Sequence, residues 1–147
     1  MRYLFPLVLL FACLAILPGC GAQSDATEAS TITASVLIEP ADAPPEWFRD
    51  VKIPDGSDGF DLLKAAVGDN LQSEWFPAFR SHFVSQIFGH KPADSAYWGV
   101  FLWNDNSRKW EPLAIGADLL SVKNDHVMGW AVVEYDPGNP QLPDSIP

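Results

Sequence analysis

The sequence predicts an α+β fold, a β-grasp-like mixed sheet with one packed helix, in a single domain of residues 34–136. Short runs of β-forming residues occur at both ends of this region. One stretch has helical periodicity, and it follows the first two β runs. A third run, near residue 100, is apolar on both faces and needs cover on both sides. A helix that follows a first hairpin and packs on a mixed sheet is the arrangement expected for this class.

The first half of the domain predicts two short strands and the helix. Residues 34–39 and 50–53 are the strands, separated by a proline-rich loop. Asp58 is positioned to cap a helix, and Gly68 is positioned to end it. The apolar residues between them recur at helical spacing and predict a buried face of Phe60, Leu63 and Val67.

The second half predicts strands at residues 83–89, 96–103 and 127–135. Residues 110–115 are expected to return along the preceding strand, with Pro112 marking an edge position. Residues 69–80 contain three aromatic side chains around Pro77 and predict an aromatic loop, which the sequence does not place relative to the sheet.

The strand predicted at 96–103 alternates with a period of two. One face carries Tyr97, Gly99, Phe101 and Trp103, and the other carries Trp98, Val100 and Leu102. A strand with two apolar faces is expected to lie inside its sheet or to carry a ligand on one face.

Residues 1–19 have the features of a secretory signal peptide, with Arg2 before an apolar run that is shorter than the roughly 20 residues of a membrane span. The run ends in Leu-Pro-Gly-Cys at Cys20, which resembles the lipobox of bacterial lipoproteins. The resemblance implies cleavage after Gly19, lipidation of Cys20 and acylation of the new amino terminus with a fatty acid such as palmitate. The alternative is an ordinary secretory signal in which the cysteine has no role.

Residues 20–33 are small and polar and predict a flexible tether of roughly 20 Å. The lipoprotein resemblance implies a cell-envelope location. Because Gly21 rather than aspartate follows the cysteine, it points to the outer membrane in a Gram-negative cell. Residues 137–147 contain four prolines and are expected to form an extended tail outside the fold.

Composition excludes several classes of function. Removal of the signal peptide leaves 8 basic and 19 acidic residues, a formal net charge of −11 that opposes nucleic acid. The two cysteines are Cys13, which cleavage removes, and Cys20, so no disulfide or thiolate metal site is expected. No nucleophile elbow, zinc-protease motif or dinucleotide fingerprint occurs, and we expect neither an enzyme nor a bound cofactor.

Several segments of the domain resemble a known family. VKIPDGSDGFDLLKAA, FVSQIFG, AYWGVFLW and EPLAIGADL occur in this order before a last strand, and the order is similar to that of the transcobalamin-like C-terminal domain. The resemblance covers about 100 residues and implies a β-grasp fold that closes over one face of cobalamin. Tyr97 and Trp98 stand at the family's Tyr-Trp pair, and the resemblance places Leu113 and Gly116 in the loop that approaches the corrin.

The sequence therefore predicts a membrane-anchored binding lipoprotein that contacts a corrinoid or another small planar ligand. The alternative is an interaction or scaffold lipoprotein that docks a partner protein or a cell-wall polymer through its aromatic surface. The candidate ligand-binding residues are Tyr97, Trp98, Trp103, Trp110, Leu113 and Gly116. Trp98 is better explained as core than as a ligand contact, and the sequence does not decide between packing and binding for Trp103 and Trp110.

The histidines give no zinc-site spacing, so no metal site is predicted. One of them could ligate the cobalt of a corrinoid, and the sequence does not choose among His82, His90 and His126.

Overall fold

The computed structural model describes residues 30–136 and 141–147. The predicted signal peptide, Cys20 and most of the predicted tether therefore lie outside the described residues, as do residues 137–140 of the tail. Within the described residues, no helix has the length and hydrophobicity to cross a membrane.

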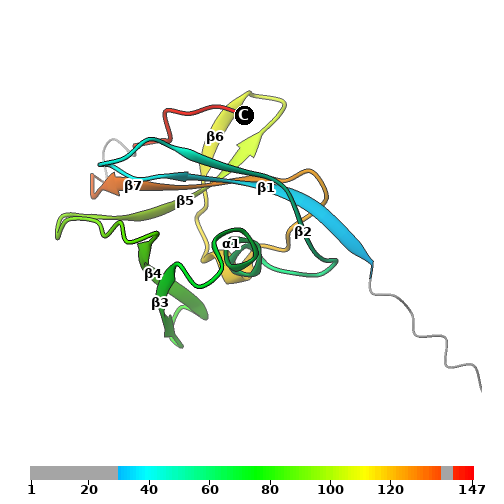
Figure 1. Ribbon diagram of the computed structural model, residues 1–147, viewed down its shortest axis with the longest axis horizontal. Coiled ribbons are helices and arrows are strands. Elements are labelled where there is room, and N and C mark those ends of the chain that lie inside the picture. The colour runs from blue at the N-terminus through cyan, green and yellow to red at the C-terminus, as the bar shows by residue number, and fades with distance from the viewer. Residues whose placement is uncertain (1–29, 137–140) are drawn as a thin grey trace, which may run out of the picture.

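Five strands form a mixed sheet in the order β2-β1-β7-β5-β6 (Figure 1). The first and last strands of the described residues, β1 and β7, pair in parallel inside the sheet, and the other neighbours are antiparallel. The α+β class predicted from the sequence is confirmed. The strands of this sheet are β1 (Thr31–Glu39), β2 (Glu46–Pro54), β5 (Ala96–Asn104), β6 (Lys109–Pro112) and β7 (Val127–Glu134).

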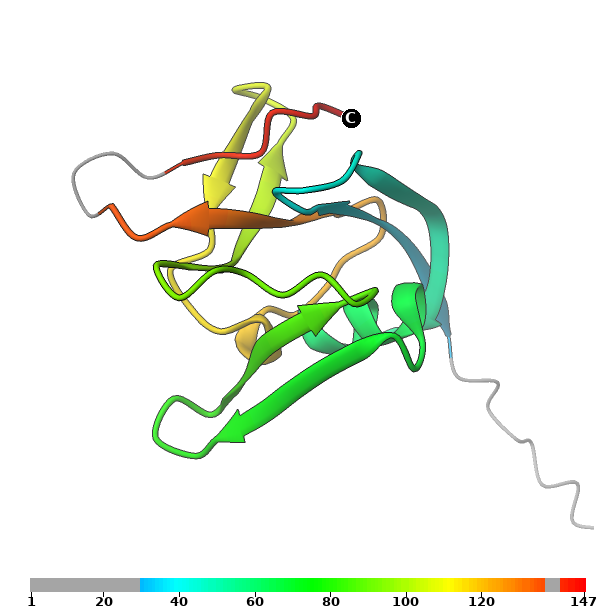
Figure 2. The ribbon, with the colours of Figure 1, turned by 60° about the vertical axis from the view of Figure 1, so that its left-hand side comes forward.

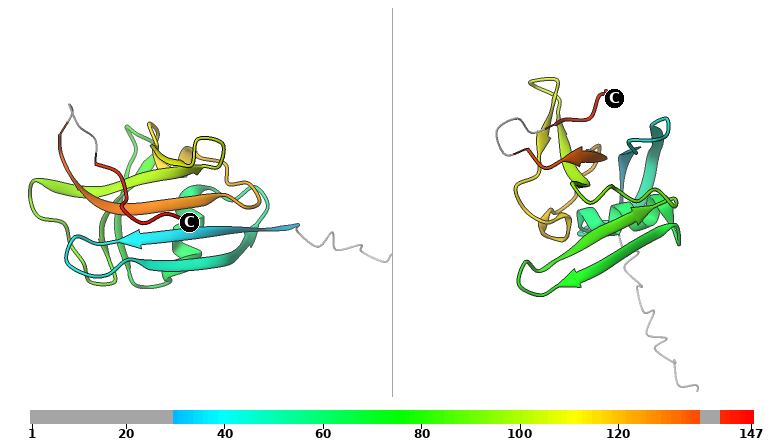
Figure 3. Two further views of the ribbon diagram at one scale, coloured as in Figure 1. Left: turned by 90° about the horizontal axis from the view of Figure 1, so that it is seen from above. Right: turned by 90° about the vertical axis from the view of Figure 1, so that its left-hand side faces the viewer.

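The helix α1 (Gly59–Val67) packs on one face of this sheet, as the sequence predicts (Figure 3). Asp58 caps it by accepting hydrogen bonds from the backbone amides of Phe60 and Asp61 at 3.0 and 2.8 Å. Gly68 ends it with a positive φ of 60°, which glycine adopts without strain. The buried apolar face consists of Phe60, Leu62, Leu63 and Val67.

The region predicted as an aromatic loop is instead the first strand of a second hairpin. Strands β3 (Leu71–Phe76) and β4 (Ser81–Ile87) form a separate two-stranded sheet on the side that carries α1 (Figure 2). All but one residue of β3 are exposed, so the strand lacks the alternation of buried and exposed positions that would reveal it in the sequence. This hairpin takes no part in the five-stranded sheet.

Strand β5 has the two apolar faces that its alternation predicts. Trp98, Val100 and Leu102 belong to the core beneath α1. Phe101 and Trp103 face the other way and pack with Trp110. The strand is hydrogen-bonded on both edges, to β6 and to β7. Both faces are thus covered by protein over most of the strand, and Tyr97 near its start is 39% exposed.

The described part of the tail covers the second face of the sheet, whereas the sequence predicted a tail outside the fold. Pro143 is buried and lies with the Trp110 indole over Gly129. The Trp110 Nε1–H donates a 2.7 Å hydrogen bond to the carbonyl oxygen of Ser145. The second apolar face of the sheet needs cover, and the indole N–H of Trp110 needs a hydrogen-bond acceptor. The tail provides both. The fold also starts before residue 34, since β1 begins at Thr31.

Candidate functional site

Exposed aromatic side chains gather on the β3–β4 hairpin. Exposed apolar groups in contiguous patches are typical of binding sites, because a soluble protein otherwise buries them. The most exposed of these side chains, Phe79, has 73% of its surface accessible. Two further exposed apolar residues lie on the segment that packs beside β4, within and before the short helix η1 (Ala117–Leu119). We define the aromatic hairpin surface as Phe76, Phe79, Phe83, Ile115 and Leu119. Trp75, which pairs with His82, lies on the other face of the hairpin.

A proline turn places Phe79 at the end of the hairpin. The amide of Phe79 donates to the carbonyl oxygen of Phe76 at 3.1 Å, with Pro77 in the second position that such turns favour. Arg80 completes the turn with a left-handed φ of 51°. The rings of Phe76 and Phe83 meet edge to face at 6.2 Å across the two strands. The hairpin therefore presents its aromatic rings from two strands and a turn.

The Asp118 carboxylate ties the hairpin to the segment around η1. Its Oδ2 accepts hydrogen bonds from the hydroxyl of Ser81 and the backbone amide of His82, both at 2.8 Å, and its Oδ1 lies 2.6 Å from His82 Nδ1. Burial raises the pKa of Asp118, but the hydrogen bonds from His82 and Ser81 outweigh it and leave the pKa below its ordinary value. The carboxylate is therefore ionised at neutral pH.

Gly116 allows these two segments to meet. A Cβ built on this residue would overlap Oγ and Cβ of Ser81, whose own side chain is buried and bonded to Asp118. The absence of a side chain at Gly116 thus has a packing reason. Gly116 also lines an apolar cavity. Its contact with Ser81 is therefore compatible with the position near a ligand that the family resemblance implies.

An apolar cavity of about 310 Å³ lies within the aromatic hairpin surface. A cavity of this size is at the lower end of those that hold small molecules, so it can receive part of a large ligand rather than enclose it. Aromatic rings on its rim can stack on a flat apolar group. The cavity is lined by Phe76, Phe79, Ser81, His82, Phe83 and Gly116.

We expect Gly116→Ala to lower the free energy of unfolding by about 1–3 kcal/mol through overpacking against Ser81. Urea denaturation measures this loss. Ser81→Gly supplies the matched control, since it leaves only the Ser81 Cα, 3.7 Å from the added methyl group. The loss in free energy of unfolding should be smaller for the double variant than the sum of the losses for the two single variants. Strictly additive losses would show that contact with Ser81 does not cause the destabilisation by Gly116→Ala.

The six residues proposed from the sequence do not form a single site. Trp98 has 5% of its surface exposed and belongs to the core, which agrees with its packing interpretation. Trp103 and Trp110 meet at 5.3 Å on the sheet face opposite α1. Neighbouring residues of a strand point to opposite faces, so a site containing both Trp98 and Trp103 would have to span the sheet.

Tyr97 and Leu113 line a smaller cavity of about 200 Å³ beside the end of β7. Gly116 alone among the six lines the cavity of the aromatic hairpin surface. The sequence did contain a signal for the residues it missed: aromatic side chains concentrated around Pro77, where a turn exposes whatever it carries.

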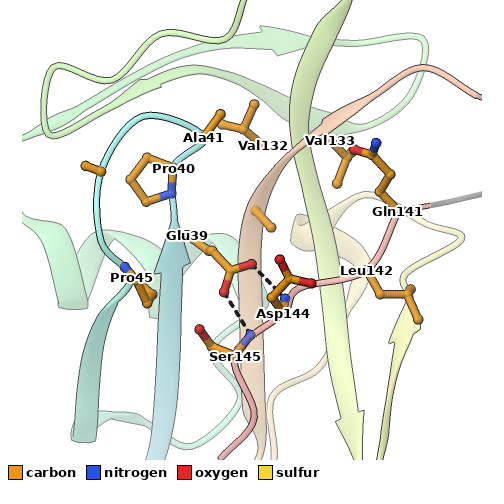
Figure 4. A pocket seen from close by; sticks show the side chains of 12 residues that line it. Glu39, Pro40, Ala41, Pro45, Val132, Val133, Gln141, Leu142, Asp144 and Ser145 are labelled. Carbon is orange, nitrogen blue, oxygen red and sulfur yellow. Dashed lines mark hydrogen bonds between the residues drawn. The ribbon is translucent and has the colours of Figure 1, made fainter.

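A larger cavity of about 570 Å³ lies between the β1–β2 loop, β7 and the tail (Figure 4). Glu39 points into it and accepts hydrogen bonds from the backbone amides of Asp144 and Ser145, at 2.8 and 3.0 Å. Both carboxylate oxygens of Glu39 are thus used to hold the tail. The remaining lining is mostly small or aliphatic side chains and offers no aromatic ring.

No protein-family model matches the sequence, and no curated protein matches it significantly. Solved structures do share the fold. Haptocorrin in complex with Cbi aligns with a TM-score of 0.59 and 18% identity, over 73% of this chain and 26% of the haptocorrin chain. A protein from Ruminococcus gnavus ATCC 29149, for which metal binding has been suggested, aligns with a TM-score of 0.56 and 13% identity, over 71% of this chain and 99% of the other.

These likenesses define the class of fold: an α+β domain with a mixed sheet, of the kind that haptocorrin contains. The present chain spans about a quarter of haptocorrin's length. At these identities the relationship concerns the fold alone. It agrees with the fold that the family resemblance implies.

Proposed function

We propose that this chain is a lipid-anchored binding protein of the bacterial cell envelope that holds a flat, partly apolar small molecule, with a corrinoid as the leading candidate. The single observation that carries the binding proposal is the aromatic hairpin surface with its 310 Å³ cavity. The resemblance of the sequence to transcobalamin-like domains supports the corrinoid, as does the fold shared with the haptocorrin–Cbi complex. The proposed role is binding without catalysis.

The geometry favours modest affinity. The cavity is open on the hairpin, so a flat ligand would lose water from one face only, and little area would be buried to offset the cost of association. The charge of the domain adds little for a neutral or cationic ligand beyond local steering, so we expect weak dependence on salt.

Titration of the protein with cobinamide and cobalamin, to millimolar concentration, tests the proposal. We expect quenching of tryptophan fluorescence after inner-filter correction, because Trp75 lies on the same hairpin, next to Phe76 in the chain, and is 47% exposed. Phe79→Ser and Phe83→Ser should each weaken binding by about 5- to 150-fold, since loss of an aromatic stacking contact costs about 1–3 kcal/mol. Calorimetry provides an independent readout.

Tyr135→Ser is the matched control for these substitutions. Tyr135 is as exposed as Phe79, at 76%, but follows the end of β7 and lines the smaller cavity of Tyr97 and Leu113 rather than the hairpin cavity. It should leave binding unchanged. If the titration gives neither quenching of tryptophan fluorescence nor a heat of binding, the corrinoid proposal is overturned. If the Phe79, Phe83 and Tyr135 variants weaken binding equally, the proposed location of the site on the hairpin is overturned.

The anchor is a separate part of the proposal and rests on the sequence ending at Cys20. We expect the wild-type protein to incorporate labelled palmitate and to fractionate with the membrane. Cys20→Ser should abolish incorporation and leave an uncleaved or mislocalised protein whose domain still folds. The anchor proposal would be contradicted if the wild-type protein incorporated no labelled palmitate. It would also be contradicted if the Cys20→Ser variant were cleaved and still fractionated with the membrane.

A docking role for a partner protein is the second candidate. The observation that favours it is the high exposure of Phe79 at the tip of a hairpin outside the main sheet. Exposed aromatic anchors of this kind are typical of the centres of protein interfaces. A photo-crosslinking residue at position 79 that captures one envelope protein in intact cells, together with failure of the titration, would put this candidate first.

A further inference from the structure

The sheet holds the tail largely through the backbone of the tail. The amides of Asp144 and Ser145 donate to the two carboxylate oxygens of Glu39, at 2.8 and 3.0 Å (Figure 4). The carbonyl oxygen of Ser145 accepts the 2.7 Å hydrogen bond from the indole N–H of Trp110. Backbone carbonyls occur in every residue, and amides in every residue but proline, so these contacts do not select the side chains at 144 and 145. Another segment that follows the same course can make the same hydrogen bonds.

The fold does select one side chain of the tail, a proline. Among the described residues of the tail, Pro143 is the one that is buried. It lies with the Trp110 indole over Gly129, where an added Cβ would be 3.2 Å from the indole and 3.4 Å from Pro143 Cγ. Trp47 and Trp103 flank the Trp110 ring. Aromatic-lined grooves of this kind recognise proline-containing segments in peptide-binding domains.

The remaining side chains of the tail make poor use of this surface. Leu142 and Ile146 are 44% and 63% exposed. The cavity of about 570 Å³ lies beside the tail, between the β1–β2 loop and β7. Asp144 also brings its carboxylate beside that of Glu39, in a chain that is already strongly acidic (Figure 4). Like charges repel, so a neutral or basic residue at this position would suit the site better than aspartate.

We define the tail groove as Glu39, Trp110, Gly129 and the cavity beside them. We infer that the tail groove is a docking site for a proline-containing segment of a partner protein, with a neutral or basic residue after the proline, and that the tail is its displaceable occupant. The tail lies on the side of the sheet opposite α1, whereas the aromatic hairpin surface lies on the side of α1 (Figure 1). The inference therefore does not depend on the ligand proposed for the hairpin.

Displacement requires the tail to leave the sheet without unfolding of the domain, and hydrogen exchange of the wild-type chain measures this opening. We expect the amides of Asp144 and Ser145 to exchange roughly 100-fold or more faster than the amides in the paired centre of β1 and β7, because local opening costs less than global unfolding. Equal exchange rates would mean that the tail leaves the sheet only when the whole domain unfolds, and would overturn the inference. This measurement needs no substitution in the protein.

A fluorescein-labelled peptide with blocked ends and the tail sequence QLPDSIP is the first probe of the tail groove. It is titrated against the wild-type chain and against Pro143→Ser, which weakens the hold on the tail. In the wild type the attached tail competes at an effective concentration of roughly millimolar order, so the peptide should bind Pro143→Ser about tenfold or more tightly than the wild type. The nuclear magnetic resonance signal of the Trp110 indole N–H should shift in Pro143→Ser and return toward its wild-type position as the peptide binds.

Further substitutions in the protein and the peptide test each contact. Glu39→Gln, combined with Pro143→Ser in the protein, should weaken peptide binding about tenfold or more, because hydrogen bonds to a charged acceptor are the stronger ones. Glu74→Gln in the same background is the matched control, since Glu74 is exposed on β3, and it should leave binding unchanged. A peptide with Asp144→Lys should bind about threefold or more tightly than QLPDSIP, with a smaller advantage at high salt. Far-ultraviolet circular dichroism checks that each protein variant is folded.

Each outcome supports or overturns the inference. Tighter binding of the Asp144→Lys peptide that depends on Glu39 supports the tail groove as a partner site. If neither peptide binds folded Pro143→Ser, or if binding leaves the Trp110 signal unmoved, the groove is overturned as a docking site. If the Asp144→Lys peptide binds no more tightly than QLPDSIP, the tail is the dedicated occupant and the partner is overturned. Should Pro143→Ser fail to fold, titration of the wild-type chain with both peptides, followed at Trp110, decides in the same way.

Discussion

Replacing Trp110 by alanine is expected to lower the free energy of unfolding by about 3–5 kcal/mol, as for other large buried aromatic residues. The indole has 4% of its surface exposed and packs against Trp103 at 5.3 Å and Trp47 at 6.4 Å. It also holds the tail through its 2.7 Å hydrogen bond to Ser145. Truncation would remove this packing and leave a cavity between the sheet and the tail.

Urea denaturation followed by circular dichroism measures the loss for Trp110→Ala. Trp75→Ala provides the control, because Trp75 has nearly half of its surface exposed and should lose much less stability. A loss for Trp110→Ala no greater than that for Trp75→Ala would mean that the tail and Trp110 do not form a packed layer on the sheet.

Leu63→Ala is expected to cost about 2–5 kcal/mol by the same measurement. Leu63 is fully buried on the inward face of α1, where the cavity left by truncation lies between the helix and the sheet. Its neighbour Lys64 supplies the control. The Lys64 ammonium makes an exposed 3.2 Å ion pair with Asp61, and such pairs contribute little, so Lys64→Ala should change stability by less than about 1 kcal/mol. A loss below about half a kcal/mol for Leu63→Ala would show that the inward face of the helix is assigned wrongly.

The helix and the central strands could be predicted from the sequence because their signals are local. Asp58 and Gly68 bound the helix through contacts within a few residues, and the alternation in β5 reflects burial on both faces of one strand. Strand β3 has no comparable signal, since its side chains face solvent almost throughout. Its pairing with β4 depends on backbone hydrogen bonds, which leave no pattern of apolar residues.

The candidate site could be predicted only in part, because it joins segments that are distant in the chain. The hydrogen bond between Ser81 and Asp118 joins residues that are 37 positions apart in the chain. No local sequence pattern around either residue predicts it. The EPLAIGADL segment did draw attention to the loop that carries Gly116, which lines the candidate cavity, and Asp118, which bonds Ser81. The tryptophans in the prediction, Trp98, Trp103 and Trp110, lie on β5 and β6 and pack within the fold, whereas the most exposed phenylalanine lies on the hairpin.

Hydrogen–deuterium exchange of the protein with and without saturating diaquacobinamide tests the central claim, that the aromatic hairpin surface is where a planar ligand binds. The account predicts slower exchange of backbone amides in residues 75–83 and 113–119, with exchange in residues 103–110 unchanged. Protection confined to residues 97–110 or to the tail, or no protection at any segment, would contradict it.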